Sequence, residues 1–212
     1  MEKFKIFERF DEVECGFSLR GEDFYEGLGV FPAQVVLANQ AHTDKVLRVD
    51  HGGDVYDGVD GFMTDKVGVV CTAKFADCQG VFMFDPVRKV VCSVHSGWRG
   101  NAKNIIGKAV RGLVAEYGCS AADLVVGVSA SLGKCCAEFS DPFVELPAEM
   151  HQYIEGSFVD LLTCSRDQLL AEGVLAENME FDGRCTVCNP ELFYSYRRGD
   201  EGRMLGGIWL KI

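Results

Sequence analysis

The sequence predicts an α+β fold in which mixed β-sheets pack together and helices flank them. Short strand-like apolar runs outnumber the segments that show helical spacing. Several connections between these runs are too short for the crossover that a parallel pair of strands requires. The 24 glycines also predict many turns. A sandwich of sheets with helices on the outside satisfies these observations.

Nine runs are predicted as strands, because each is apolar or alternating and is bounded by Gly, Asp, Asn or Pro. They cover Lys3–Phe7, Glu12–Ser18, Gln34–Ala38, Lys45–Val49, Gly68–Ala73, Gly80–Phe84, Val90–His95, Leu124–Val128 and Met204–Lys211.

Two segments show clear helical periodicity. The first runs over Asn101–Tyr117, with Asn101 as a suitable N-cap and Gly118 as a stop. The second covers about Phe158–Glu172, and a weaker helical pattern covers Pro147–Glu155.

Length and composition predict a single domain over residues 1–212. The chain is 48% hydrophobic and 25% charged and contains no repeat, low-complexity tract or Pro/Ser-rich linker. Its longest uncharged apolar stretch, Val67–Ala73, is far shorter than the roughly 20 residues that span a bilayer, so we expect no membrane partner.

Charge and the N-terminal sequence predict a cytoplasmic protein with small-molecule ligands. The first residues mix charges with apolar side chains and show no cleavage site for a signal peptide. A net charge of −11 disfavours nucleic acid, whose binders present basic faces. We expect either a monomer or a small homo-oligomer.

Residues 76–100 predict a hairpin that brings a cysteine and a histidine face to face. Asp85-Pro-Val-Arg88 suits a type I turn between two apolar runs. With the turn centred on its middle two residues, Cys78 lies opposite His95. Directly opposed Cβ atoms are about 4.5–5.5 Å apart, so the two side chains can share a metal ion or a proton. The alternative is a small core residue at Cys78 and a hydrogen-bonded turn residue at His95.

The loop that follows His95 has the composition of an anion site. Gly97 and Gly100 let the backbone approach a ligand, and Arg99 can clamp a phosphate or carboxylate. Free amides at the start of the following helix favour negative charge as well. The alternative is a tight loop with Trp98 in the core and Arg99 in solvent.

Seven motifs then follow one another in a recognisable order. They are Asn39-Gln-Ala-His42, Asp60-Gly-Phe-Met-Thr64, Ala76-Asp-Cys78, Asp85-Pro86, His95-Ser-Gly-Trp-Arg-Gly100, Cys185-Thr-Val-Cys188 and Phe193-Tyr-Ser-Tyr-Arg-Arg198. From about residue 16 to 210 the chain resembles the laccase-domain family of purine nucleoside phosphorylases, whose members were long labelled polyphenol oxidases. The family fold resembles that of a group of cysteine hydrolases.

The resemblance implies a zinc ion held by His42, Cys78 and His95. Family members phosphorolyse adenosine, inosine and methylthioadenosine and deaminate adenosine, and some are implicated in cytoplasmic correction of peptidoglycan precursors. Three protein ligands leave a fourth position for water or substrate, as in catalytic zinc sites. Water acidified on that zinc would attack the C6 atom of adenosine, which accounts for deamination.

Phosphorolysis requires in addition a bound phosphate, for which Arg99 with Gly97 and Gly100 is the first candidate. Gln40 and Arg197 are further candidates for binding nucleoside or phosphate.

Asp77 is a candidate for proton transfer, although on a strand its side chain would point away from Cys78. The segment between Arg20 and Gln34 is shorter than is usual in the family, so the preferred nucleoside stays open.

Other functions remain for the same residues. A metal-free thiolate–imidazolium dyad of Cys78 and His95 would suit hydrolysis of an amide, such as a peptidoglycan precursor. A non-catalytic alternative treats the zinc as a structural staple, or the chain as a binding module. Multicopper chemistry is disfavoured because it requires many imidazole ligands and the chain has 4 histidines, so we expect zinc rather than copper.

A separate cysteine pattern has two interpretations. Cys185 and Cys188 suit a redox pair, or half of a zinc knuckle completed by Cys135 and Cys136. The alternative is a group of reduced core thiols, as expected for a cytosolic chain with 10 cysteines.

Overall fold

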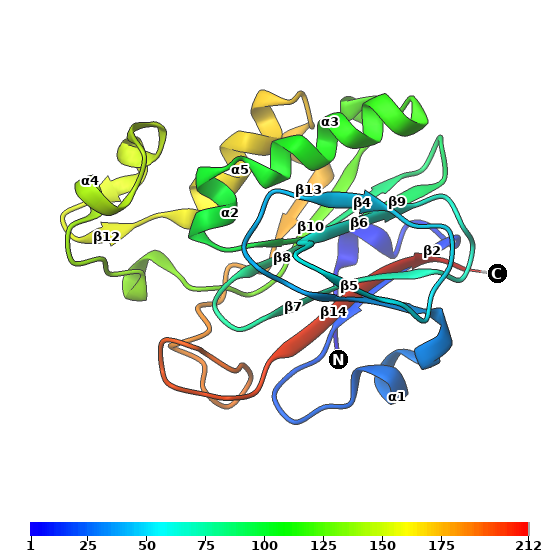
Figure 1. Cartoon of the computed structure of the whole chain (residues 1–212), viewed down its shortest axis with the longest axis horizontal. Helices are drawn as coiled ribbons and strands as arrows, with labels where there is room; N and C mark the ends of the chain where they lie inside the picture. The colour runs from blue at the N-terminus through cyan, green and yellow to red at the C-terminus, as the bar shows by residue number, and fades with distance from the viewer. Residues whose placement is uncertain (212) are drawn as a thin grey trace.

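Two six-stranded sheets lie face to face, with helices on their outer sides (Figure 1). The computed structural model describes residues 1–211. The first sheet has the order β1 (Glu2–Lys3), β2 (Val13–Phe17), β14 (Met204–Leu210), β7 (Val70–Phe75), β3 (Val35–Asn39) and β5 (Val55–Asp57). The second has the order β13 (Met179–Phe181), β10 (Val125–Val128), β8 (Gln79–Asp85), β9 (Val90–Ser96), β6 (Gly61–Thr64) and β4 (Val46–Arg48).

The remaining elements are short, apart from two helices. The helices are α1 (Phe24–Leu28), α2 (Trp98–Ala102), α3 (Ile105–Tyr117), α4 (Pro142–Glu145) and α5 (Leu161–Ala171), and β11 (Ile154–Glu155) pairs with β12 (Phe158–Val159). The 3₁₀ segments are η1 (Lys5–Phe7), η2 (Pro32–Gln34), η3 (Ala121–Asp123), η4 (Lys134–Cys136), η5 (Ala148–Tyr153) and η6 (Ala176–Asn178). No helix within residues 1–211 has the length and apolar character needed to cross a membrane.

Both sheets are mixed, which confirms the predicted α+β class. Strand β3 runs parallel to β5 and β7, β4 to β6, and β10 to β13, whereas the other pairs are antiparallel. Three of the four parallel pairs include a short strand that the sequence pattern did not predict, namely β5, β6 or β13, and β5 and β13 lie at sheet edges.

Strand β8 shows how the layers are built. Alternate side chains of a strand point to opposite faces. Accordingly, Phe82 and Phe84 enter the core between the two sheets, whereas Val81 and Met83 pack in the core beneath α3 and α5. All four are fully buried, and burying each contributes roughly 1.5–3 kcal/mol relative to exposure. A smaller cluster that includes Phe24 and Trp209 covers the outer face of the first sheet under α1.

The N-terminal segment departs from the prediction of a strand over Lys3–Phe7. Only Glu2 and Lys3 pair with β2, and the chain then turns into η1. The turn has a packing reason, because the three-residue spacing of a 3₁₀ turn places Phe4 and Phe7 together in the core, each 3% exposed.

The predicted helix over Asn101–Tyr117 is in fact two helices. Asn104 adopts a left-handed conformation with φ 53°, which ends α2, and its side chain caps α3 by accepting from the main-chain N–H of Gly107. The predicted N-cap, Asn101, is instead buried and hydrogen-bonded to Ser96 and to the carbonyl of Leu161.

Two further helical predictions are shortened. The segment predicted over Phe158–Glu172 begins as β12 and becomes α5 only after Asp160, whose side chain caps the helix. The weak pattern over Pro147–Glu155 is the 3₁₀ segment η5 followed by β11.

Candidate active site and metal centre

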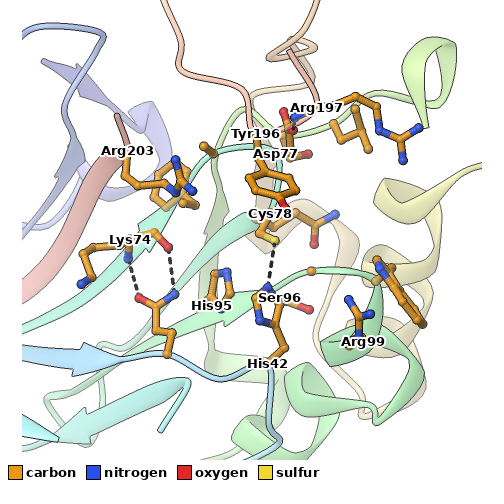
Figure 2. A pocket seen from close by; sticks show the side chains of 18 of the residues that line it. His42, Lys74, Asp77, Cys78, His95, Ser96, Arg99, Tyr196, Arg197 and Arg203 are labelled. Atoms are coloured by element: carbon orange, nitrogen blue, oxygen red, sulfur yellow. Dashed lines mark hydrogen bonds between the residues drawn. The ribbon is translucent and has the colours of Figure 1, made fainter. Parts of the chain in front are cut away.

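The candidate site lies where the ends of the two sheets meet, at the base of a cavity of about 1140 Å³. Its centre is formed by His42, from the loop after β3, Cys78, which precedes β8, and His95, near the end of β9. Figure 2 shows the three side chains turned toward one another, with Tyr196 above them. The volume is sufficient for a drug-sized or nucleoside-sized ligand.

The loop that carries His42 is anchored by Gln40. The side-chain amide of Gln40 donates to the carbonyl oxygen of Lys74 and accepts from its N–H, both at 2.8 Å, as dashed lines mark in Figure 2. This pair continues the contact between β3 and β7 beyond the last strand residue. His42 itself has φ 54° in the left-handed region, a conformation that the loop must stabilise.

The hairpin forms in a register two residues away from the predicted one. Gly80, not Cys78, pairs with His95. The register depends on the turn, because four residues separate Asp85 from its partner Val90. The Asp85 carboxylate accepts the main-chain N–H groups of Val87 and Arg88, which stabilises this longer turn. Because side chains alternate with a period of two, this slip keeps Cys78 and His95 on the same face, as diagonal rather than direct neighbours.

The shifted register places Gly97 beside the thiol. A Cβ atom at position 97 would lie 2.5 Å from Cys78 Sγ and 3.5 Å from His42 Cδ2. Only glycine therefore lets β9 pass this closely behind the sulfur.

The three predicted metal ligands converge. Cys78 Sγ lies 3.9 Å from His42 Nε2, the two imidazole ring centres are 5.0 Å apart, and the donor atoms of all three residues lie within 4.8 Å of one another. These spacings and a donor set of two imidazoles and one thiolate fit a zinc ion, which binds nitrogen at about 2.0–2.1 Å and sulfur at about 2.3 Å.

Asp60 organises the site from below. Its buried carboxylate accepts from His95 Nδ1 at 2.8 Å, from the hydroxyl of Thr43 at 2.7 Å, and from the main-chain N–H of His42 at 3.1 Å. One carboxylate thus orients the ring of His95 directly and also holds the loop that carries His42. The engaged Nδ1 of His95 leaves Nε2 for a metal ion, the usual arrangement of a carboxylate–histidine pair.

The same contacts shift the acid–base properties of the site. Burial raises the pKa of Asp60, but hydrogen bonds from His95 and Thr43 outweigh it and lower the pKa to about 2. Burial lowers the pKa of His95, yet Asp60 and Cys78 raise it to about 9. Burial raises the pKa of Cys78, whereas hydrogen bonds with His42 and His95 lower it to about 7. Without a metal ion the pair therefore favours a thiolate beside an imidazolium at neutral pH.

The prediction placed Asp77 on a strand. In the structure it lies in a bend instead, with φ 82°. Its carboxylate accepts the hydroxyl of Thr186 at 2.6 Å and the N–H of Arg197 at 2.7 Å. Asp77 lines the cavity next to Cys78, and it also joins three distant parts of the chain.

Basic side chains surround the cavity in a chain whose net charge is −11. Figure 2 shows Lys74 and Arg203 on one side of Cys78, and Arg99 and Arg197 on the other. Arg99 stacks on Trp98, with its guanidinium carbon 4.1 Å from the ring centre, and Arg197 donates to the carbonyl of Glu138.

The residues of the predicted anion loop lie in two different environments. Gly100 does not line the cavity; it is buried against Ser96 and Ile105, where a larger residue would crowd α3. The helix that follows the loop is α2, whose first residues Trp98 and Arg99 line the cavity, whereas α3 begins at Ile105 and contributes no residue to the cavity wall. Gly97 and Arg99 do line it.

Sequence reasoning gave no role in the site to Asp60, Lys74, Tyr196 or Arg203, although Asp60 and Tyr196 stand in motifs that carry the family resemblance. A signal existed for Asp60, because an acidic residue stands at the start of an apolar strand, an unfavourable place for a charge without a partner. No spacing rule would have brought Arg203 or Tyr196 to this cavity.

The two packed mixed sheets thus carry a His₂Cys group that could hold a metal ion, in a cavity lined by basic side chains. Residues 20–211 match the model of the family described as multi-copper polyphenol oxidoreductase laccase. The chain belongs to this family, which confirms the resemblance seen in the motifs.

Several characterised relatives are similar over most of the chain. Purine nucleoside phosphorylase YlmD of Geobacillus stearothermophilus is 34% identical, with 79% of this chain and 68% of that protein covered. Purine nucleoside phosphorylase LACC1 of Mus musculus is 31% identical, with 82% of this chain covered, and the chain spans only 46% of that protein. Adenosine deaminase RL5, from an unknown prokaryotic organism, is 28% identical, with 87% and 78% covered.

Solved structures share the fold. YlmD from Geobacillus stearothermophilus superposes with a TM-score of 0.86 at 27% identity and covers 96% of this chain and 93% of its own. The Bacillus licheniformis hypothetical protein YfiH gives a TM-score of 0.88 at 23% identity, with 99% and 96% covered, which speaks for the fold alone.

Proposed function

We propose that the chain is a zinc-dependent purine nucleoside phosphorylase that also deaminates adenosine. The observation that carries the proposal is the convergence of His42, Cys78 and His95 at the base of a large cavity lined by basic side chains. The names of the relatives, purine nucleoside phosphorylase and adenosine deaminase, support the same reaction classes. Adenosine, inosine and methylthioadenosine are the proposed nucleosides, and inorganic phosphate is the second substrate.

The two imidazoles and the thiolate would hold the zinc ion. An ion with three protein ligands supplies an open Lewis-acid position that activates water or polarises a bound group. We favour zinc over copper because a multicopper centre needs many imidazoles and the chain has 4 histidines.

The cavity's own residues would bind the anionic and neutral parts of the substrates. Arg99, beside Gly97, is the proposed phosphate clamp on one side of the centre, with Arg197 near it. A guanidinium binds phosphate through two parallel hydrogen bonds, which positions the nucleophile as well as attracting it. The exposed ring of Tyr196, which lines the cavity above the centre, offers a surface for the purine.

Asp77 would take part in proton transfer. Its carboxylate is held in the cavity wall beside Cys78 by the hydroxyl of Thr186 and the N–H of Arg197, within reach of a bound substrate. Gln40, whose amide is engaged with Lys74, would contribute by positioning the His42 loop at the cavity wall.

The direct test measures release of free base from the three nucleosides, with and without phosphate, together with inosine formation from adenosine. Base release that requires phosphate is the expected result. His42→Ala and Cys78→Ala are expected to lose both activities, whereas His51→Ala, an exposed histidine outside the cavity, is expected to keep both. Full activity of His42→Ala or Cys78→Ala would overturn the shared metal site.

One observation favours a second candidate, a metal-free amide hydrolase. Asp60, His95 and Cys78 form a chain of contacts in which a carboxylate orients an imidazole next to a thiol of pKa about 7. Such an arrangement activates a cysteine nucleophile, and a peptidoglycan precursor is the candidate substrate. Alkylation separates the two functions, since Cys78 in a zinc site resists iodoacetamide and a hydrolase thiolate reacts with it.

A further inference from the structure

A second group of sulfur atoms lies outside the site described above. Its members come from two loops far apart in the sequence, the turn η4 and the segment after Arg184, and none of them lines the cavity. The group, called here the four-cysteine cluster, consists of Cys135, Cys136, Cys185 and Cys188, whose sulfur atoms all lie within 4.8 Å of one another.

The spacing of the cluster matches a tetrahedral metal site. Cys188 Sγ lies 3.7 Å from Cys135 Sγ and 3.6 Å from Cys136 Sγ. Four sulfurs at about 2.3 Å from a zinc ion are about 3.8 Å apart along each edge of the tetrahedron. A disulfide would require about 2.05 Å, and all four cysteines are free in this structure.

The backbone around the cluster is shaped for sulfur ligands. A Cβ atom at Gly133 would lie 3.3 Å from both Cys135 Sγ and Cys185 Sγ, so the backbone of the first loop passes directly beside sulfur atoms of both loops. Gly133 is required by the close approach of the two loops, because a Cβ atom there would lie 2.9 Å from Cys185 Cβ.

Arg198 fixes the second loop from the other side. Its guanidinium donates to the carbonyls of Thr186 and Val187, at 2.9 and 3.1 Å. These are the two residues between the paired cysteines, so the turn that presents both sulfurs is held in place. The guanidinium itself is held by the carboxylate of Asp200 at 2.5 Å.

We propose that the four-cysteine cluster is a structural zinc site, distinct from the candidate catalytic centre. Four protein thiolates would close the coordination sphere, the hallmark of a structural rather than a catalytic site. The cluster combines exposed members with the buried Cys185, so zinc can enter from solvent.

The proposed ion would also stabilise the wall of the active site. Thr186, inside the second loop, donates its hydroxyl to Asp77 and its N–H to the carbonyl of Ser131. Leu132, just before the first loop, donates its N–H to the carbonyl of Asp77. Joining the two loops through a metal ion therefore fixes the residue that precedes Cys78.

Zinc content of the purified protein tests the proposal without reference to activity. Protein prepared in zinc-supplemented medium, under reductant and without chelator, is expected to contain about two zinc ions per chain. Cys188→Ser and Cys78→Ala are each expected to retain about one, and the double variant almost none. Cys119→Ser is the matched control, because Cys119 is a buried free cysteine that belongs to neither group of candidate ligands; it is expected to retain two.

X-ray absorption of Cys78→Ala adds a readout on the coordination, with four sulfur neighbours at about 2.3 Å expected. Wild-type protein also allows a test that needs no variant: the four thiols are expected to resist alkylation until a chelator is added. One zinc per chain that Cys188→Ser leaves unchanged would overturn the proposal. Disulfides between the two loops under reductant, or iron in place of zinc, would overturn it as well.

Discussion

The carboxylate of Asp60 accepts the Nδ1 proton of His95 at 2.8 Å, and the same carboxylate holds the main-chain N–H of His42. A single buried side chain thus positions two of the three candidate ligands, one through its ring and the other through its backbone. His42 follows β3 of the first sheet and His95 lies on β9 of the second, so Asp60 links the loop of one sheet to a strand of the other at the site.

Asp60→Asn is therefore expected to weaken zinc binding at the catalytic centre by about 10- to 100-fold, the usual effect of losing a carboxylate behind a histidine ligand. The amide keeps the size of the side chain but loses the charge that fixes the His95 tautomer. Competition with a chromophoric chelator measures the affinity, and Asp54→Asn, at a half-exposed position outside the cavity, serves as the control. Unchanged affinity would show that Asp60 does not tune the ligand.

Gly97→Ala is expected to displace the Cys78 sulfur and lower catalytic-centre zinc affinity at least tenfold. The added Cβ would lie 2.5 Å from that sulfur, a distance that forces the thiol or β9 to move. Gly112→Ala is the matched control, because its Cβ would meet only the flexible end of Met63. Zinc titration and the thermal midpoint of both variants separate a local effect from loss of folding. A Gly97→Ala variant with wild-type affinity would contradict the geometry.

Zinc affinity at the catalytic centre is expected to rise with pH. His95, with its pKa raised to about 9, and Cys78, with its pKa lowered to about 7, titrate as a pair. Between pH 7 and 9 the metal displaces one proton, from the imidazolium, so affinity rises about tenfold per pH unit. Below pH 7 the thiol proton must leave too, and the dependence steepens.

Chelator competition from pH 6.5 to 9.5, corrected for the chelator's own protonation, measures this profile. The same titration of Cys78→Ala measures zinc bound elsewhere on the chain, which is subtracted. An affinity that stays flat between pH 7 and 9 would mean that the imidazolium does not form.

The hairpin illustrates what could be predicted from sequence and what could not. Period-two alternation identified the common face of Cys78 and His95, and that conclusion survived a register error of two residues, because such a slip preserves the face. The register itself depended on the turn, where the carboxylate of Asp85 collects main-chain N–H groups and lengthens the loop. Side-chain capping of this kind competes with standard turns and is hard to read from composition.

Helix boundaries failed for a related reason. The apolar spacing through residues 101–117 is continuous, and only the left-handed backbone of Asn104 divides it. The basic residues of the cavity were hard to predict because they come from separate loops. Lys74 and Arg203 reach the same cavity through tertiary packing, about which local periodicity carries no information.

The last prediction separates phosphate binding from the metal centre. Arg99→Ala is expected to raise the KM for phosphate in phosphorolysis at least tenfold, because a bidentate clamp on an anion is lost. Deamination uses water and no phosphate, so its kcat/KM for adenosine is expected to stay within about twofold of the wild type. Arg166→Ala removes an exposed arginine of α5 that lies outside the cavity and is expected to change neither reaction. Equal loss of both reactions in Arg99→Ala would assign the guanidinium to the nucleoside or to the integrity of the loop, and Arg197 would then be the next candidate for the phosphate contact.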